Sequence, residues 1–323
     1  MICRNCKNQN FRKIFKLGSQ PISSTFLKKK KKIKSFSLDL YLCKKCNLVQ
    51  LKEIPRLKDM YGKNYGYKTS VSNLMVNHLK KKYETFKKKK ILQNHSNILD
   101  IGSNDGTFLN FFAKNNKNLN LYGIDPSATA FEDNYDKKIY LIKNFFSEKI
   151  LRKKLIKNKK FSLIVSYAMF YDVEDPNNFC KNISKILDDK GIWSLEFSYF
   201  PLLLKNLTYD QICHEHCTYY TLNTFKKIVE KNGLKITELN VNEINGGSIE
   251  VSCAKKDSNH RVNKKKILKF LSYENKITNN VYKNFQKRVI QNKKELINFL
   301  KKIKSKKIIG YGASTKGNVI LNY

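Results

Sequence analysis

The sequence predicts an α/β protein built around a parallel sheet, and three observations lead to this prediction. From residue 80 onward, short apolar segments alternate with amphipathic ones, as strands alternate with helices in such a fold. An acidic, glycine-rich turn follows the first of these strands at residues 100–106. Two Cys-x-x-Cys pairs precede the alternating region in a stretch with little helical periodicity. A small cysteine-bearing module is therefore expected in front of a larger α/β domain.

Length and hydrophobic content indicate more than one structural unit. The 323 residues exceed one average domain, and a hydrophobic share of 41% is enough for sizeable cores. We expect three units: residues 1–60, 61–256 and 257–323. No apolar run approaches the roughly 18 residues of a membrane span, and the N-terminus does not begin like a signal peptide. We therefore expect a cytoplasmic protein with no membrane partner.

The formal net charge of +38 raises the question of nucleic-acid binding, since lysines that neutralise phosphates drive such binding. The lysines lie along the whole chain, however, together with abundant Asn, Ile, Phe and Tyr, as an AT-rich genome would produce. Runs such as residues 28–32 and 87–90 are more often solvated faces than binding arms. We expect no nucleic-acid partner, although the positive field would favour a phosphorylated substrate.

The alternating region predicts its strands and helices in a definite order. Strands are expected at residues 97–101, 119–124, 139–142, 161–166 and 191–197, with helices at 107–114, 128–135, 147–155 and 178–187. A helix at 222–232 and strands near 234–241 and 248–254 complete the domain. The lysine-rich residues 261–304 have helical periodicity and form one long helix or two. Residues 307–317 predict a further strand, a glycine turn and the start of a helix.

The turn after the first strand predicts a binding site for an adenosine cofactor. Asp100 lies near the end of the strand, at the edge of the sheet where ligands bind. Gly102 and Gly106 can let the backbone approach a ligand closely. The alternative is an ordinary turn between a strand and a helix, since acidic glycine turns are common in α/β proteins.

Other residues around this turn favour S-adenosylmethionine over a dinucleotide. Asp125, followed by Pro126, ends the next strand and is placed to accept hydrogen bonds from two ribose hydroxyls. Asn104 and Asp105 stand where a dinucleotide site requires bare backbone against pyrophosphate. A cationic cofactor such as S-adenosylmethionine therefore fits better.

The four N-terminal cysteines have the spacing of a zinc site. Cys3 and Cys6 form one Cys-x-x-Cys pair, and Cys43 and Cys46 form the other, so that each loop can hold one side of a tetrahedral zinc ion. Two disulfides are disfavoured in a reducing cytosol, and a redox pair would need no second pair. Four thiolates leave no open position for a substrate, which indicates a structural zinc ion.

Residues 209–220 concentrate two of the five histidines with a carboxylate and three tyrosines. Either His214 or His216 could act as a base near neutral pH. A second metal site that includes Cys213 and Cys217 is one alternative. Alternation along a strand would put the two cysteines on the face opposite the histidines, which disfavours it. The other alternative is a pair of histidines hydrogen-bonded in the core.

Taken in order along the chain, these motifs resemble those of the S-adenosylmethionine-dependent C-methyltransferases of the nucleotide-sugar type. The resemblance covers essentially the whole chain and is carried by the cysteine pairs, Pro21 and the segments 48–51, 61–70, 101–106, 123–126, 214–216, 245–248 and 311–317. It implies a central Rossmann-like class I methyltransferase domain and a small N-terminal zinc-binding domain. An incomplete C-terminal α/β unit is expected as well, because complete family members continue well beyond the last of these segments.

The resemblance also implies roles for particular residues. The second histidine of the His-Glu-His unit carries the role of the base, which assigns it to His216 with Glu215 as its neighbour in the site. Tyr65 and Tyr67 match a tyrosine motif whose side chains reach the active site. Cys213 stands where sugar-modifying relatives usually carry tyrosine, which leaves the methyl acceptor open.

The reaction implied by the resemblance is methylation of a carbon atom. The expected acceptor is a nucleotide-linked keto-sugar or a similar small molecule with a carbonyl group, which the histidine would convert to an enolate. Two alternatives remain. One is an O- or N-methyltransferase that acts on a small molecule, and the other is a cofactor-binding remnant with impaired catalysis.

Overall fold

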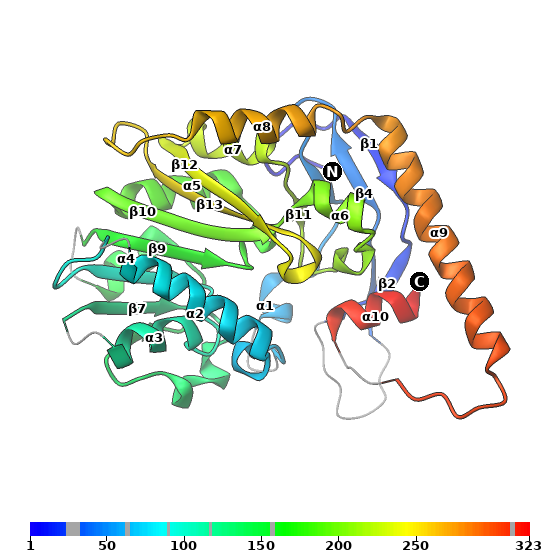
Figure 1. Cartoon of the computed structure of the whole chain (residues 1–323), viewed down its shortest axis with the longest axis horizontal. Helices are drawn as coiled ribbons and strands as arrows, with labels where there is room; N and C mark the ends of the chain where they lie inside the picture. Colours follow the sequence, from blue (N-terminus) through cyan, green and yellow to red (C-terminus); the bar gives the residue numbers. More distant parts are fainter. Residues whose placement is uncertain (24–32, 62–64, 89–90, 116–117, 156–158, 311–313) are drawn as a thin grey trace.

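A seven-stranded sheet forms the centre of the computed structural model, which describes residues 1–23, 33–61, 65–88, 91–115, 118–155, 159–310 and 314–323 (Figure 1). The strands lie in the order β12-β13-β10-β9-β6-β7-β8. Their bounds are β6 (Asn97–Ile101), β7 (Asn120–Ile124), β8 (Ile139–Ile142), β9 (Phe161–Tyr167), β10 (Leu187–Ser198), β12 (Leu234–Asn242) and β13 (Ser248–Lys255). The predicted α/β fold is confirmed.

The strands at one edge of the sheet run in directions that were not predicted. The five strands from β8 to β10 pair in parallel, as the alternation of strands and helices predicts. β13 is antiparallel to both β10 and β12. The last two strands are joined by a short connection with no crossover helix between them, which brings β13 back alongside β12 in the opposite direction.

Helices cover both faces of the sheet, because successive side chains of a buried strand point to opposite sides. In β6, Ile98 packs with Phe112 on one face, whereas Leu99 belongs to the cluster of Phe179 and Phe225 on the other. All five side chains are at least nine-tenths buried. The covering helices are α2 (Asn73–Lys88) and α3 (Thr107–Asn115) on the first face, and α4 (Glu148–Lys154), α5 (Pro176–Ile186) and α7 (Leu222–Lys231) on the second (Figure 1).

Local sequence signals set the start of these helices. The carboxylate of Asp175 accepts a hydrogen bond from the backbone N–H of Asn178, and Pro176 takes the first position of α5, where its missing N–H costs nothing. Thr221 and Thr224 cap the start of α7 reciprocally, each side chain bonding the other residue's backbone.

The helix predicted over residues 128–135 is wrong. This stretch forms two 3₁₀ turns, η2 (Ala128–Ala130) and η3 (Glu132–Asn134). Ser127 donates both its backbone N–H and its hydroxyl to the Asp125 carboxylate, at 2.6 and 2.5 Å, and the Asn110 amide donates to the last carbonyl of η3 at 2.8 Å. These side-chain hydrogen bonds compete with the helical pattern at both ends of the segment.

The N-terminal module includes a strand from the central part of the chain. Its four-stranded antiparallel sheet contains β1 (Phe11–Phe15), β4 (Leu40–Cys43), β5 (Val49–Leu51) and β11 (Thr218–Tyr219), in that order. β2 (Ser19–Pro21) and β3 (Ser35–Ser37) pair with each other, and the short helix α1 (Leu57–Met60) follows. Because β11 lies within the histidine segment, residues 209–220, the module and the predicted active site are joined by hydrogen bonds.

The C-terminal part is helical throughout its regular structure, with α8 (Lys264–Glu274), α9 (Asn279–Lys302) and α10 (Thr315–Asn322). Residues 261–304 thus contain two helices. The strand predicted after residue 307 is absent from residues 307–310, and its glycine turn falls partly outside the described residues. None of the described helices is long and apolar enough to cross a membrane.

One core cluster crosses the predicted domain limits. Phe285 and Val289 of α9 are buried against Phe15 of β1 and Val49 of β5. Phe200 of α6 (Phe200–Asn206) belongs to the same cluster. Residues from all three predicted units therefore share one apolar core, and the limits at residues 60 and 256 stay predictions.

A buried ionic network joins α2 to the sheet and gives a first testable prediction. Glu196, only 2% exposed, accepts hydrogen bonds from His78 at 2.9 Å and Asn242 at 2.8 Å, and pairs with Lys82 at 3.0 Å. Burial opposes ionisation, but His78 and Lys82 outweigh it and hold the pKa of Glu196 below its ordinary value of 4.5. Ionised Glu196 therefore stabilises the fold at pH values above its ordinary pKa of 4.5. This stabilisation is lost as the pH falls through the lowered pKa of the folded protein.

Replacing Glu196 with alanine is expected to cost about 3 kcal/mol of unfolding free energy at neutral pH, because His78, Asn242 and the buried ammonium group of Lys82 lose this partner and Lys82 keeps only Glu250 as an ion-pair partner among the described residues. Urea unfolding at neutral and acid pH measures the effect, and the gap between wild type and variant should narrow in acid. Alanine at Glu53, an exposed residue whose one ion pair in the described part of the chain is with Lys52, is the matched control. An equal loss of stability in both variants would contradict the assignment.

Candidate active site and zinc site

A cavity lies at the carboxyl ends of the parallel strands β6, β7 and β9. Its volume is about 390 Å³, within the range of about 300–1,000 Å³ typical of small-molecule sites. Asp100, Asp125 and the segment 168–173 line it from the sheet side. His216 and Lys316 line it as well, from the histidine segment and from α10. The cavity therefore lies where ligands bind in an open α/β sheet.

The glycine turn has the backbone conformation that only glycine adopts freely. Gly102 and Gly106 have φ angles of +78° and +76°, in the left-handed region. A Cβ atom on Gly102 would lie 3.0 Å from the side chain of Met169, and one on Gly106 would lie 2.8 Å from the ring of Tyr135. Tyr135 in turn donates a hydrogen bond to the backbone carbonyl of Asn104 in the same turn, at 2.8 Å.

Replacing Gly106 with alanine is therefore expected to displace Tyr135 and distort the turn. We expect a loss of about 1–3 kcal/mol of stability from the strained φ angle and the overpacked ring. Affinity for S-adenosylhomocysteine should fall about tenfold, which calorimetry measures, since about 1.4 kcal/mol of distortion corresponds to that factor. Alanine at Gly310, where a Cβ atom would meet nothing within 4 Å, is the control. Unchanged binding by the Gly106 variant would contradict this account of the turn.

Asp125 lines the cavity beside Pro126, as expected for a ribose-binding carboxylate. One of its oxygens accepts a hydrogen bond from the backbone N–H of Asn104 at 2.9 Å, and the other accepts two from Ser127. These bonds hold the carboxylate in place at the end of β7. Each carboxylate oxygen can accept more than one hydrogen bond, so the contact with ribose stays a prediction compatible with this placement.

A group of three carboxyl groups beside the turn fits a cationic ligand. Burial, together with the charges of Asp125 and Asp105, raises the pKa of Asp100 to about 8. The free site thus crowds negative charge into a buried corner of the sheet, and a positive group would relieve this repulsion. S-adenosylmethionine carries a sulfonium and an ammonium group, so the residues present fit this cofactor.

Asn104 and Asp105 hold a neighbouring segment, a role that the sequence did not reveal. The Asn104 side chain accepts hydrogen bonds from the backbone N–H and hydroxyl of Thr69, at 2.9 and 3.0 Å, and donates to the carbonyl of Tyr67 at 3.0 Å. Asp105 accepts from the backbone N–H of Ser70 at 2.8 Å. Among the described residues that line the cavity, Asn104 is present and Asp105 is not. Gly106 is likewise outside that group.

The tyrosine segment fixed in this way forms one wall of the cavity. The rings of Tyr61 and Tyr65 lie 5.1 Å apart, and those of Tyr65 and Tyr67 lie 6.5 Å apart. All three side chains line the cavity, with Tyr67 at the rim, 46% exposed. Burial, followed by the charges of Asp172 and Glu215, raises the pKa of Tyr65 well above its ordinary value. Its hydroxyl therefore keeps its proton and can donate a hydrogen bond to a ligand.

His216 lies on the cavity wall with one ring nitrogen already bonded. Nδ1 lies 2.8 Å from the carbonyl oxygen of Gln211, so this nitrogen must carry the proton that it donates. Nε2 consequently has a free lone pair in the neutral ring. Tyr171 packs against the imidazole, with 4.0 Å between ring centroids. Burial, followed by the charge of Lys316, lowers the pKa of His216 to about 3, so the ring is neutral at physiological pH.

Glu215 lies on the same wall as His216. Its two carboxyl oxygens accept hydrogen bonds from Thr315 at 3.1 Å and from Ser23 at 3.2 Å. Burial raises its pKa above the ordinary value. Because Ser23 belongs to the N-terminal module and Thr315 to α10, Glu215 joins the two ends of the chain at the cavity.

His214 lies apart from His216 and Glu215. Its side chain is 1% exposed and donates from Nε2 to the carbonyl of Phe36 at 3.3 Å, and it is not among the described residues that line the cavity. Burial, the larger effect, lowers its pKa. This placement favours the alternative of a histidine hydrogen-bonded in the core, and a catalytic role for His214 stays a prediction.

The cysteines of the histidine segment do not form a second metal site with the histidines. In the described part of the chain, the four N-terminal cysteines are the one group of potential metal ligands found close together. Residues 212–217 are not a strand, so the expected alternation of side chains along this segment is wrong. Cys217 donates instead to the carbonyl of Tyr171 at 3.3 Å, and Cys213 is buried at the cavity wall.

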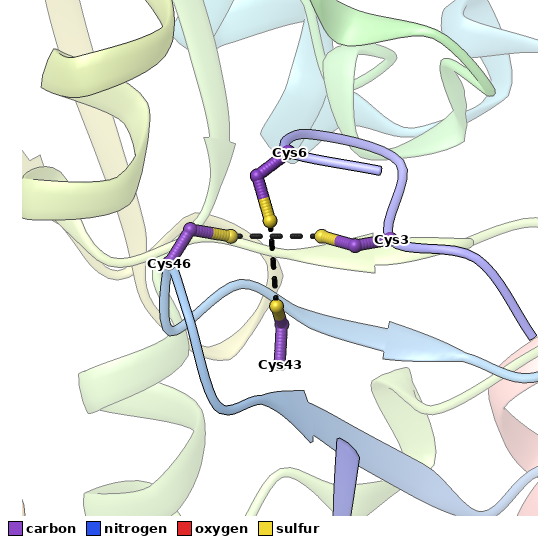
Figure 2. A group of neighbouring side chains, drawn as sticks. All are labelled: Cys3, Cys6, Cys43 and Cys46. Atoms are coloured by element: carbon purple, nitrogen blue, oxygen red, sulfur yellow. Dashed lines mark hydrogen bonds between the residues drawn. The ribbon is translucent and has the colours of Figure 1, made fainter. Parts of the chain in front are cut away.

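The four N-terminal thiols converge from two loops onto one point (Figure 2). Cys3 and Cys46 have their Sγ atoms 3.5 Å apart, as do Cys6 and Cys43, and all four atoms lie within 4.8 Å of one another. Tetrahedral zinc with bonds of about 2.3 Å requires sulfur atoms about 3.8 Å apart. Asn47 adopts a φ angle of +62° directly after the second pair, as such a turn demands. The donor set therefore fits a structural zinc ion.

The structure adds residues to the site that the sequence did not single out. Tyr171 and Asp172 line the cavity in the turn η4 (Phe170–Asp172) after β9, and Asp172 has a buried oxygen with no partner among the described residues. Their position just beyond the carboxyl end of a parallel strand could have identified them. Lys316 lies within a motif that the resemblance included, but its distance along the chain from the sheet gave no indication of its place in the cavity.

Comparison with known proteins identifies the class that this fold and site define. A family model described as a methyltransferase domain matches residues 75–239, slightly more than half of the chain, and the chain belongs to this family. A zinc binding domain model matches residues 3–61, and a model of a C-methyltransferase C-terminal domain matches residues 243–323. The protein is an S-adenosylmethionine-dependent methyltransferase with an N-terminal zinc site, as the resemblance implied.

The individual relatives share less than a quarter of their aligned residues with this chain. The C-methyltransferase NovU of Streptomyces niveus is 24% identical over 328 aligned residues, which cover 99% of this chain and 77% of that protein. Among solved structures, the magnesium protoporphyrin IX methyltransferase of Synechocystis PCC 6803 is 12% identical, with 56% of this chain and 83% of that one covered and a TM-score of 0.44. The plantazolicin methyltransferase BpumL is 15% identical, with 50% and 76% covered and a TM-score of 0.40.

Proposed function

We propose that this enzyme methylates a carbon atom next to the carbonyl group of a small molecule, with a nucleotide-linked keto-sugar as the favoured acceptor. The observation that carries the proposal is the neutral His216, which lines the cavity that contains residues of the cofactor turn and whose Nδ1 is bonded to the carbonyl of Gln211. The match to a C-methyltransferase C-terminal domain and the relative named as a C-methyltransferase support carbon as the atom methylated.

The chemistry requires a base and a hydrogen-bond donor on the acceptor side. Carbon next to a carbonyl group becomes nucleophilic only when it loses a proton and the charge moves onto the oxygen. We assign the removal of that proton to Nε2 of His216 and the hydrogen bond to the oxygen to the protonated Tyr65; both residues line the cavity, which supports this assignment. Bound S-adenosylmethionine supplies the electrophilic methyl group. The cavity aligns the two partners, which accounts for much of the expected acceleration.

We also propose the roles of the three units, the compartment and the size of the acceptor. We assign residues 1–60 to zinc binding, residues 61–256 to methyl transfer and residues 257–323 to a C-terminal unit that closes the cavity through Thr315 and Lys316. None of the eight cysteines is in a disulfide bond, which agrees with a reducing compartment such as the cytoplasm. The acceptor is expected to be a small molecule, since the cavity volume of about 390 Å³ suits one.

Proton exchange tests the proposal without requiring turnover. The enzyme is incubated in deuterated water with S-adenosylhomocysteine and a thymidine-diphosphate 4-keto-6-deoxyhexose, and the sugar is analysed by NMR. We expect deuterium at a carbon next to the ketone, at a rate well above that without enzyme. Thymidine-diphosphate glucose, which has no ketone, is the control substrate. Absence of exchange, combined with methylation of an oxygen or nitrogen acceptor, would contradict the proposal.

A further inference from the structure

Lys316 occupies an unusual place among the basic residues of this chain. It is the one lysine or arginine among the described residues that line the cavity, in a protein of net charge +38. Carboxyl-bearing side chains line the same cavity at five positions: Asp100, Asp125, Asp172, Glu174 and Glu215. A single cation in such surroundings is suited to meet a negative charge on a ligand.

The position of the ammonium group is defined by its neighbours. Lys316 lies in the first turn of α10, and its Nζ donates to the side-chain oxygen of Asn245 at 3.1 Å. Asn245 is held in the left-handed region, with φ of +54°, in the turn that precedes β13. The preceding residue, Thr315, bonds Glu215, so the start of α10 is tied to the wall that carries His216. An ammonium group has three N–H donors, and Asn245 takes one of them.

Lys316 and His216 line the same cavity, and the charge of the lysine acts on the histidine. The charge of Lys316 is the second cause, after burial, that lowers the pKa of His216. Burial also lowers the pKa of Lys316 itself, although the charge of Asp210 opposes this. The charge of Lys316 thus disfavours the protonated form of His216, which is the form that proton removal produces. This arrangement helps the reaction only if the same charge stabilises a negative group that forms in the same step.

We propose that Lys316 is a catalytic residue whose ammonium group stabilises the negative oxygen of the enolate during methyl transfer; this inference rests on the proposed function. Nε2 of His216 takes the proton from the carbon atom next to the carbonyl group. The electrons of that C–H bond form a C=C bond, and the carbonyl π electrons move to the oxygen beside Lys316. The carbon then forms its bond to the methyl group while the bond from methyl to sulfur breaks and leaves its electron pair on sulfur.

The alternative for a lone cation is to bind an anionic group of the substrate, such as a phosphate, equally in the ground state and the transition state. The two roles differ in kinetics. Uniform binding appears in KM, whereas charge stabilisation that develops only during the reaction appears in kcat. Lys316 lines the same cavity as His216, and Thr315 beside it is bonded to Glu215, the neighbour of the base, which favours the second role.

The test compares the full-length zinc-loaded enzyme with its Lys316→Met and Lys316→Arg variants. Loss of a preorganised oxyanion partner typically costs about 100-fold to 1,000-fold in kcat, and we expect Lys316→Met to lose at least about 100-fold in both kcat and deuterium exchange. KM for the thymidine-diphosphate 4-keto-6-deoxyhexose should change by less than about threefold, because ground-state binding is retained. Lys316→Arg, which keeps the charge, should recover part of the rate.

Controls separate this inference from the proposed function and from misfolding. Lys301→Met removes an exposed lysine of α9 and should leave kcat and KM unchanged. Thermal unfolding and S-adenosylhomocysteine affinity of Lys316→Met should match the wild type. If Lys316→Met exchanges deuterium at the wild-type rate, the role of Lys316 is overturned and the proposed function is not. A large rise in KM with unchanged kcat would overturn it in favour of anion binding. Wild-type enzyme without any exchange would overturn the proposed function, and this inference with it.

Discussion

Replacing His216 with alanine is expected to lower methyl transfer and deuterium exchange by about 100-fold to 10,000-fold, the usual contribution of a positioned general base. The reason lies in the ring geometry: Nδ1 donates to the carbonyl of Gln211, which orients Nε2 as the free lone pair. Affinity for S-adenosylhomocysteine should stay close to that of the wild type, because the cofactor turn at residues 100–106 belongs to a different wall of the cavity.

A matched control is available for this substitution. His260 also donates a ring N–H to a backbone carbonyl, that of Lys190 at 3.0 Å, but lies on the surface away from the cavity. His260→Ala should therefore behave as the wild type in both assays. Equal exchange rates for the wild type and His216→Ala would show that another group removes the proton.

The same residue predicts the pH dependence of activity. Burial and Lys316 lower the pKa of His216 to about 3, so the ring stays neutral and able to accept a proton far below the ordinary value of 6.5. A decline of kcat/KM as the pH falls through that ordinary value is therefore not expected from His216. Removing the charge of Lys316 should raise the pKa of His216 and move the acid limb of the profile to higher pH. An acid limb at the ordinary histidine value in the wild type would contradict the described environment.

Removal of zinc is expected to have the second large effect. Cys43 ends β4, and the zinc-binding turn connects β4 to β5. β5 pairs with β11, and the backbone N–H of Leu51 donates to the carbonyl of Cys217, next to His216. Structural zinc sites contribute folding free energy directly, with apparent values of about 10–16 kcal/mol in isolated zinc-finger peptides. Loss of zinc should therefore loosen the segment that carries the base as well as the N-terminal module.

The substitution Cys43→Ser tests this coupling. We expect zinc content to fall to background, the melting temperature to drop, and kcat to fall by at least about 100-fold, because misplacing a catalytic group by about 1 Å costs that much. S-adenosylhomocysteine should still bind, since the cofactor turn lies on the central sheet. Cys253→Ala removes a buried thiol of β13 outside the zinc site and should keep zinc and activity. A zinc-free enzyme with normal turnover would contradict the coupling.

Local patterns in the sequence predicted the centre of the fold well. The strands at residues 97–101 and 139–142 begin and end where predicted, because apolar β-branched residues are bounded by turn residues there. The glycine turn and the cysteine pairs were recognisable for the same reason: their chemistry is contained in a few consecutive residues. The helix predicted over 128–135 failed, since Asp125 and Asn110 bind its ends from outside the segment.

Contacts between distant parts of the chain were beyond prediction from local patterns. β13 runs antiparallel to β12 after a short connection, a direction that was not predicted. The pairing of β11 with β5 depends on how the chain returns after a long connection, which composition does not encode. Local patterns also do not indicate that Asn104 bonds Thr69, or that Lys316 lines a cavity formed by residues far earlier in the chain. Side chains that act at a distance require the tertiary structure to be identified.

The position of the transferred methyl group tests the central claim most directly. Enzyme is incubated with S-adenosylmethionine labelled with carbon-13 on its methyl group and with a thymidine-diphosphate 4-keto-6-deoxyhexose, and the purified product is analysed by two-dimensional NMR. The proposed function predicts a methyl signal in the aliphatic region that is coupled to a ring carbon of the sugar next to the ketone. A labelled methyl group bonded to oxygen or nitrogen would contradict it.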